Sequence, residues 1–221
     1  MNIKQLIVPV AAAATLALLP LSSQASLTLQ ISDGVSTLNI ADGSALDQAA
    51  DAGAIAYAGG FNGWNFVIGF GSSAADPLAM HLTASVFGDR ADGQLNISFT
   101  QTDLVASAPE LSFSADGGGS AANAGIQGGW AAYVDDSNTA FGQATTVAGV
   151  SGFGTGSGWA LVPLSGTYSA TLVTNFDYRG LGNTSPYGSS LDISMRVPEP
   201  SSMALMFVAL LGLGLTLRRR A

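Results

Sequence analysis

Apolar and polar side chains alternate along most of the middle of the chain. Leu27, Leu29 and Ile31 have polar neighbours as far as Asp33-Gly34, a pair of residues favoured in hairpin turns. A period of two is typical of strands that bury one face. The same pattern predicts about ten short strands, at residues 27–31, 38–40, 64–70, 80–86, 95–99, 126–134, 141–147, 159–164, 168–176 and 191–197. We therefore expect an all-β fold, a two-sheet antiparallel β-sandwich with a jelly-roll-like arrangement.

Three segments between these strands lack the pattern. Residues 45–52 have room for one helical turn between two glycines. Residues 117–124 and 149–158 are rich in Gly, Ser and Ala, a composition that predicts mobile loops.

The first 25 residues have the features of an export signal. Lys4 gives a positive start, residues 6–21 are almost uninterruptedly apolar, and small residues lead to Ala25. A first transmembrane helix is the alternative, but two prolines bracket a stretch that is short for a span. We expect a signal helix that signal peptidase removes by cutting the chain between Ala25 and Ser26.

The last residues repeat these features in reverse order. The apolar run 203–217 would form ~22 Å of helix, which is shorter than the ~30 Å hydrocarbon core of a membrane. With the two serines before it, we expect residues 201–217 to form a single transmembrane helix of minimal length. Basic residues next to a span stay in the cytoplasm, which places the preceding domain on the periplasmic side. The motif before the span is Val197, Pro198, Glu199 and Pro200, and the stop after it is Arg218, Arg219 and Arg220.

This three-part tail resembles the PEP-CTERM sorting signal of Gram-negative bacteria, over residues 198–221. The resemblance implies a membrane-embedded exosortase that cuts near the motif and releases or re-attaches the protein outside. It implies an inner-membrane anchored precursor and a mature form that is extracellular or at the cell surface. The same type of tail is also labelled an ice-binding-protein C-terminal domain, a label that gives no warrant for ice binding. The chain thus divides into a signal peptide at 1–25, a sandwich at 26–197 and a sorting tail at 198–221.

Charge narrows the choice of partners. The chain has a net charge of −8, and residues 26–197 carry three arginines against 14 acidic side chains with no lysine. Such a surface repels polyanions, so we expect no nucleic acid partner. The chain has no cysteine, and stability outside the cell must come from a core or from bound ions.

Catalytic residue types are scarce. His81 is the one histidine, so any serine nucleophile would need it as the base, and its strand position puts it on the polar face. No Gly-x-Ser-x-Gly elbow is present, one histidine argues against zinc, and Glu110 is the one glutamate of residues 26–197. We expect no catalytic activity.

We expect no cofactor, but four carboxylates in turns are candidates for a calcium site. Asp89 and Asp92 flank one turn, and Asp135 and Asp136 lie together in another. Oxygen-rich loops bind calcium, but aspartates in turns need no metal to explain them.

The three tryptophans admit two interpretations. Trp64, Trp130 and Trp159 could form a platform for stacking sugars, but each lies in an alternating apolar run, which favours core packing.

These observations predict an exported structural protein of the surface or extracellular matrix, associated with biofilm exopolysaccharide and without catalytic function. The alternative is a carbohydrate-binding sandwich module, with or without calcium. The expected partners are signal peptidase, an exosortase-type enzyme and extracellular polysaccharide.

Overall fold

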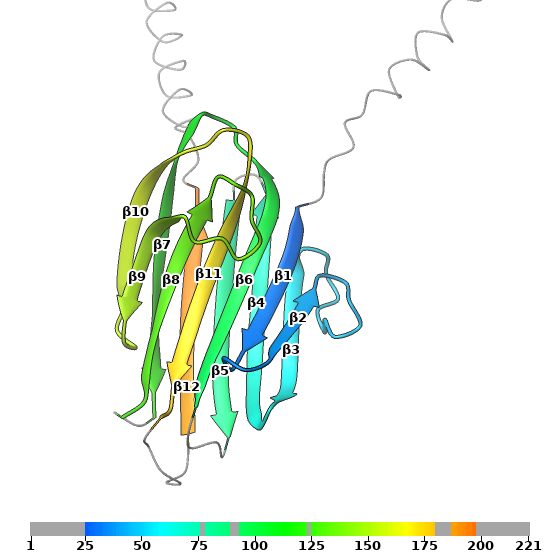
Figure 1. Ribbon diagram of the computed structural model, residues 1–221, viewed down its shortest axis with the longest axis vertical. Helices are drawn as coiled ribbons and strands as arrows, with labels where there is room; N and C mark the ends of the chain where they lie inside the picture. The colour runs from blue at the N-terminus through cyan, green and yellow to red at the C-terminus, as the bar shows by residue number, and fades with distance from the viewer. Residues whose placement is uncertain (1–24, 76–77, 89–92, 123–124, 180–186, 198–221) are drawn as a thin grey trace, which may run out of the picture.

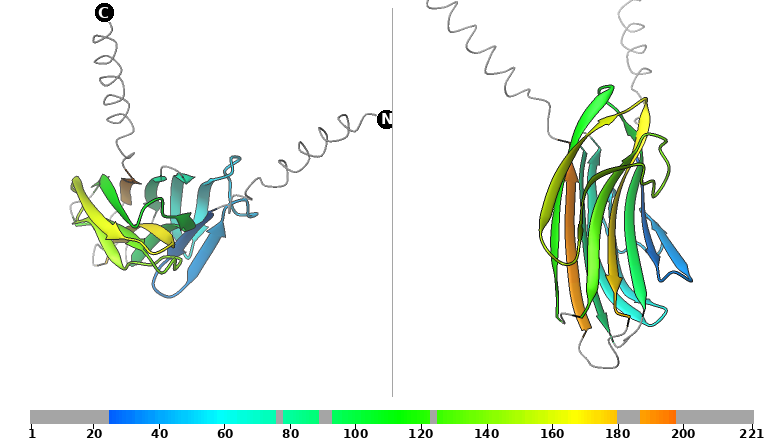
Figure 2. Two further views of the ribbon diagram at one scale, coloured as in Figure 1. Left: turned by 90° about the horizontal axis from the view of Figure 1, so that it is seen from above. Right: turned by 60° about the vertical axis from the view of Figure 1, so that its left-hand side comes forward.

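The described part of the chain consists of two antiparallel sheets of six strands each (Figure 1). The computed structural model describes residues 25–75, 78–88, 93–122, 125–179 and 187–197. Those ranges contain no helix, and therefore none with the length and hydropathy of a membrane span. The predicted signal helix and membrane helix lie outside the described residues. The two-sheet sandwich is confirmed, and Figure 2 shows its two layers from above.

Sheet A faces the viewer in Figure 1, and its strand order is β2-β1-β6-β11-β8-β9. Its strands are β1 (Ser26–Ser32), β2 (Thr37–Ala41), β6 (Gln94–Val105), β8 (Gln127–Asp135), β9 (Thr145–Ser151) and β11 (Thr167–Asp177).

Sheet B lies behind it, with the order β10-β7-β12-β5-β4-β3. Its strands are β3 (Ala54–Phe61), β4 (Trp64–Ala75), β5 (Leu78–Gly88), β7 (Glu110–Ala121), β10 (Gly156–Pro163) and β12 (Tyr187–Arg196).

The eight strands β5 to β12 follow a jelly-roll order. They run β5-β12-β7-β10 in one sheet and β6-β11-β8-β9 in the other. The last two strands therefore insert between strands formed much earlier in the chain, as two interlocked Greek keys require. Strands β1 and β2 extend sheet A beside β6, and β3 and β4 extend sheet B beside β5.

The core fills the space between the sheets with the alternating residues that the sequence placed on one face of each strand. Two edge-to-face aromatic contacts join the layers: Phe113 with Tyr168, with ring centroids 5.7 Å apart, and Trp64 with Tyr178, at 5.3 Å. Burying each such side chain contributes roughly 1.5–3 kcal/mol, which is how this cysteine-free domain is held together.

The glycine-rich segments are strands, so their prediction as loops was wrong for most of their length. Gly117 and Gly119 lie in β7 and pair with the central strand β12. A Cβ on Gly117 would lie 2.9 Å from Cε2 of Trp130, and one on Gly119 would lie 2.6 Å from Cδ2 of Leu191. The missing side chains make room for these two large core residues. Residues 149–151 likewise belong to β9, and residues 156–158 belong to β10.

Strand β3 was not predicted, although the Asn62-Gly63 pair that follows it is a strong hairpin signal. Both residues have positive φ, 49° and 85°, as the tight turn between β3 and β4 requires.

Two other predictions were also wrong. Residues 45–52 contain turns and no helix: the N of Asp47 donates to the carbonyl oxygen of Ser44, and the N of Gln48 donates to the carbonyl oxygen of Ala56 in β3. The strand predicted at 141–147 begins at Thr145, because Phe141 adopts a φ of 59° within a loop.

Candidate functional site

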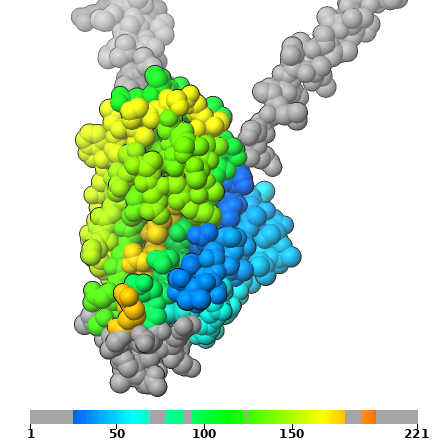
Figure 3. All heavy atoms as spheres, viewed as in Figure 1, coloured from blue at the N-terminus to red at the C-terminus, as the bar shows by residue number. Residues whose placement is uncertain are grey.

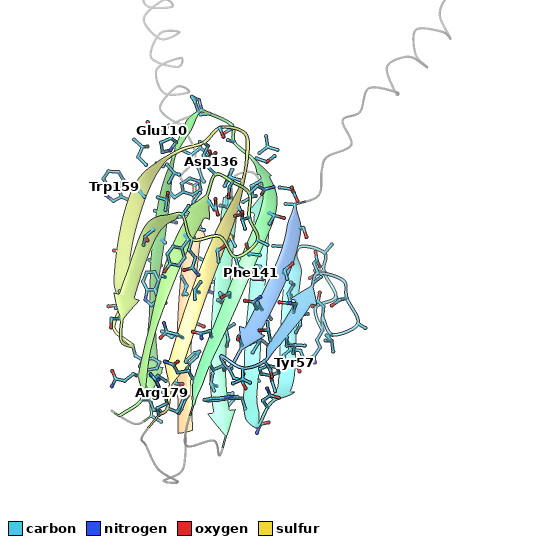
Figure 4. All side chains as sticks on the ribbon, viewed as in Figure 1. Tyr57, Glu110, Asp136, Phe141, Trp159 and Arg179 are labelled. Atoms are coloured by element: carbon cyan, nitrogen blue, oxygen red, sulfur yellow. The ribbon has the colours of Figure 1, made fainter. Side chains whose placement is uncertain are left out.

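The outer face of sheet A is partly covered by the loop between β8 and β9, residues 136–144. The Oγ of Ser169 donates to the carbonyl oxygen of Thr139 at 2.7 Å, and the backbone N of Phe141 donates to Oγ1 of Thr100 at 3.3 Å. Thr100 and Ser169 are buried as a result. Figure 3 shows this loop over the upper half of sheet A, and Figure 4 labels Phe141 within it. We call this surface the covered face.

The carboxylates of Asp135 and Asp136 bind different serines of the protein. Oδ1 of Asp135 accepts hydrogen bonds from N and Oγ of Ser137, at 2.8 and 2.6 Å. Asp136 accepts from N and Oγ of Ser165, at 2.6 and 2.8 Å, and these bonds lower the pKa of its carboxyl. The two carboxylates thus fasten their own loop and the loop between β10 and β11.

The other two calcium candidates, Asp89 and Asp92, lie outside the described residues. Within residues 25–75, 78–88, 93–122, 125–179 and 187–197, no group of three or more His, Asp or Glu side chains has an arrangement that could hold a metal ion.

A reciprocal pair of hydrogen bonds fastens the covering loop to β6. The backbone N of Asp103 donates to Oδ1 of Asn138 at 2.8 Å, and Nδ2 of Asn138 donates to Oδ1 of Asp103 at 2.9 Å. Both residues have positive φ, which Asp and Asn tolerate better than other side chains. The contact joins residues 35 positions apart, and nothing in the alternation pattern signals it.

The outer face of sheet B exposes polar side chains from β7, β12 and β5. We call this surface the open face. Cross-strand register sets Asp116 beside Ser194 and Ser194 beside His81 in one row. The next two rows are Gly118, Asp192 and Thr83, and then Ser120, Ser190 and Ser85.

The first row, together with Gly118 and Asp192 of the second, lines a groove of about 460 Å³. Nε2 of His81 lies 2.5 Å from Oδ1 of Asp192, with the two side chains 43% and 60% exposed. Oγ of Ser194 donates to Oδ1 of Asp116 at 2.9 Å. The serine hydroxyl is therefore engaged with a carboxylate rather than with the imidazole, so this cluster is not arranged as a serine nucleophile and its base.

Glycine forms the floor of this groove. A Cβ on Gly118 would lie 2.8 Å from Cγ2 of Thr155, which stands at the groove's side. The loop that carries Thr155 is tied to the sheet, since the N of Gly119 donates to the carbonyl oxygen of Phe153 at 3.0 Å.

A second groove, of about 350 Å³, continues along the same face. Its polar lining includes Ser85, Ser120 and Ser190, and the hydroxyl oxygens of Ser120 and Ser190 lie 3.3 Å apart. Half-exposed Phe87 stands at its end.

Trp159 stands out from the edge strand β10, and Figure 4 shows it pointing away from the sandwich. It is 72% exposed, so the prediction that it packs in the core was wrong. Trp64 and Trp130, at 2% exposure each, are core residues as predicted. Exposed Leu161 follows Trp159 on the same strand.

Sequence reasoning found only part of the open face. The predicted strand 191–197 has Asp192 and Ser194 on its polar side by alternation, and His81 is expected on the polar face of its own strand. Asp116 was missed because the glycines after it were interpreted as a loop.

The tail is the part of the chain that matches a known protein family. The family model described as the PEP-CTERM protein-sorting motif matches residues 196–220. The chain carries a PEP-CTERM sorting signal. This confirms the predicted resemblance and makes the chain a membrane-associated precursor sorted to the cell surface, with an exosortase-type enzyme as its processing partner.

The PEP-CTERM match begins at Arg196, the last residue of β12, and no curated protein matches the chain significantly. Among solved structures, the chain is similar to the enzymatically active domain of tailspike protein 4 of bacteriophage CBA120. The identity is 14%, the TM-score is 0.31, and the match covers 62% of this chain and 20% of the phage chain. Similarity at this level carries no inference about function.

Proposed function

We propose that this chain is the precursor of a non-catalytic structural protein of the cell surface or extracellular matrix, associated with exopolysaccharide. The observation that carries the proposal is the sorting motif at residues 196–220, which begins at the last residue of β12, the final strand of the sandwich. In this proposal the sandwich is delivered to the periplasmic side and then released or re-anchored through its tail.

The position of β12 supports processing at the motif rather than before it. This strand lies between β5 and β7, and its pairing is extended by the N of Val197, which donates to the carbonyl oxygen of Leu78 at 3.0 Å. A cut before Arg196 would remove part of this central strand, and a cut before Val197 would remove the hydrogen bond that extends its pairing, whereas a cut at or after Pro198 keeps both. At the other end, β1 begins at Ser26, the residue after the proposed signal peptidase site.

The arrangement around His81 supports a role without catalysis. Its imidazole contacts Asp192 at the surface, and the nearby Ser194 hydroxyl donates to Asp116. A carbohydrate-binding module is the second candidate function, because β10 carries the exposed Trp159 and also contributes Gly156 to the polar groove, and aromatic and polar groups together suit sugar recognition.

Mass spectrometry of the C-terminus tests the sorting proposal. The full chain is expressed in a Gram-negative host that has an exosortase, beside the double variant Pro198→Ala with Pro200→Ala and the control variant Val105→Ala. We expect the unaltered chain and the control to end near Pro198 and to leave the inner membrane. We expect the double variant to keep Ala221 and stay in the membrane.

A mature, unaltered protein that still ends in Ala221 would contradict sorting. Hydrolysis of a glycan by the pure protein, lost in the variant His81→Gln, would contradict the non-catalytic role.

A further inference from the structure

We propose that the open face is a binding surface for a neutral polysaccharide, which lies along the two grooves and stacks one sugar ring on Trp159. This inference rests on the proposed matrix function and adds to it a site and a ligand class.

The polar groups of the open face match the hydroxyl groups of a sugar chain. Asp116 and Asp192 supply carboxylate acceptors, and Ser120 and Ser190 supply hydroxyls that both donate and accept. Hydrogen bonds to carboxylates are about twice as strong as those between neutral groups. Neutral glycans are favoured over acidic ones, because residues 26–197 carry three arginines against 14 acidic side chains.

The indole of Trp159 supplies the apolar part of the site. Ser157 pairs with Asp116 of the first groove, and Trp159 lies two residues further along the same side of β10, at a spacing of about 7 Å. Its side chain projects from the edge strand and is largely exposed, so a sugar ring can reach its face without rearrangement of the sheet.

The groups that would bind are already oriented. Ser194 holds the carboxylate of Asp116, and His81 contacts the carboxylate of Asp192. Gly118 has no side chain that could fill the groove. Pre-oriented groups reduce the entropy lost on binding.

The length of the open face favours a chain over a single sugar. From His81 to Phe87, β5 runs for about 20 Å past both grooves. A monosaccharide would occupy only a fraction of that distance.

Native affinity electrophoresis of the full chain in nonionic detergent tests the site. The gels contain hydroxyethylcellulose, dextran or galactomannan as neutral probes, or alginate as an acidic one. We expect at least one neutral probe to retard the protein. We expect Trp159→Ala to weaken its retardation about tenfold or more, and Asp192→Asn to weaken it by a similar factor. Trp159→Phe should keep most of the affinity, and Val105→Ala, an exposed apolar residue at the end of β6, should keep all of it.

Three results would overturn the proposal: no retardation by any neutral probe, equal retardation of Trp159→Ala, or retardation by alginate alone. Self-association that depends on Trp159 without any glycan would assign the face to a second copy of the chain instead. Sorting is measured separately, by the C-terminal mass and the cell fraction. A correctly sorted protein that binds no glycan therefore refutes this site and leaves the proposed function standing.

Discussion

The covered face and the open face both carry hydrogen-bonded polar side chains, but those of the covered face are buried and those of the open face are exposed. On the covered face, Thr100 and Ser169 bond with a loop of the protein itself and are buried. On the open face, Asp116, Ser120 and Asp192 contact Ser194, Ser190 and His81 but stay exposed. A buried polar atom with an internal partner stabilises the fold, whereas an exposed polar atom can exchange water for a ligand. Composition alone therefore does not tell a structural face from a binding face.

The largest expected effect comes from forcing the loop away from the covered face. A Cβ on Gly142 would lie 2.0 Å from Oδ2 of Asp135, so Gly142→Ala must displace the loop or the carboxylate. We expect a loss of about 1–3 kcal/mol in the free energy of unfolding, measured by urea denaturation. Gly118→Ala on the open face is the matched substitution, and we expect it to weaken glycan binding more than stability. Equal stability losses in both variants would contradict the distinction between the faces.

Removing the side chain of Asn138 should have the next largest effect. Asn138→Ala deletes both hydrogen bonds with Asp103 and leaves alanine at a φ of 56°. We expect a loss of about 1–2 kcal/mol in thermal or urea denaturation. Ser112→Ala, on an exposed position of β7, should change stability by less than about 0.5 kcal/mol. A neutral Asn138→Ala variant would mean that the loop is not held by this contact.

Ser194→Ala should separate binding from stability. It removes the hydroxyl that holds the carboxylate of Asp116 on a solvent-exposed surface. We expect the unfolding free energy to change by less than about 0.5 kcal/mol and the neutral-glycan affinity to fall by a measurable factor. Unchanged affinity together with reduced stability would assign Ser194 to the fold alone.

The smallest expected effect is the change in stability at acidic pH. A hydrogen bond from Arg179 lowers the pKa of Asp177 to about 2. Hydrogen bonds from Ser165 to the carboxylate of Asp136 lower the pKa of Asp136. A carboxyl whose pKa is lower in the folded state stabilises the protein above its unfolded pKa of about 3.9, and that contribution is lost as the pH falls toward 2. We expect Arg179→Gln to raise the pKa of Asp177 toward 3.8, as followed by NMR titration. A pKa that stays near 2 would mean that another group controls it.

Alternation predicted the sandwich well because most strands bury one face and expose the other. The face of Met80, Leu82, Ala84 and Val86 in β5 is buried as expected. Alternation fails at edge strands: in β10, Trp159 and Leu161 alternate with Ala160 and Val162, so both faces are apolar, and the sequence does not indicate which one points inward.

Long-range pairing explains why the candidate site could not be predicted. His81 and Asp192 are 111 positions apart and meet only because β12 inserts beside β5. Glycine runs also mislead, since β7 uses them to fit Trp130 against a paired strand rather than to form a loop. The sorting tail, by contrast, is recognisable from the sequence, because its residues are neighbours along the chain.

Hydroxyl-radical footprinting with mass spectrometry compares the two faces in one experiment. The protein is exposed to radicals with and without the neutral polysaccharide that retards it most, and oxidation is measured at Trp159 and His81 on the open face. Tyr133 and Phe141 on the covered face serve as internal references. We predict that the polysaccharide protects Trp159 and His81 and leaves Tyr133 and Phe141 unchanged. Protection confined to the covered face, or absent from both, would contradict a binding role for the open face.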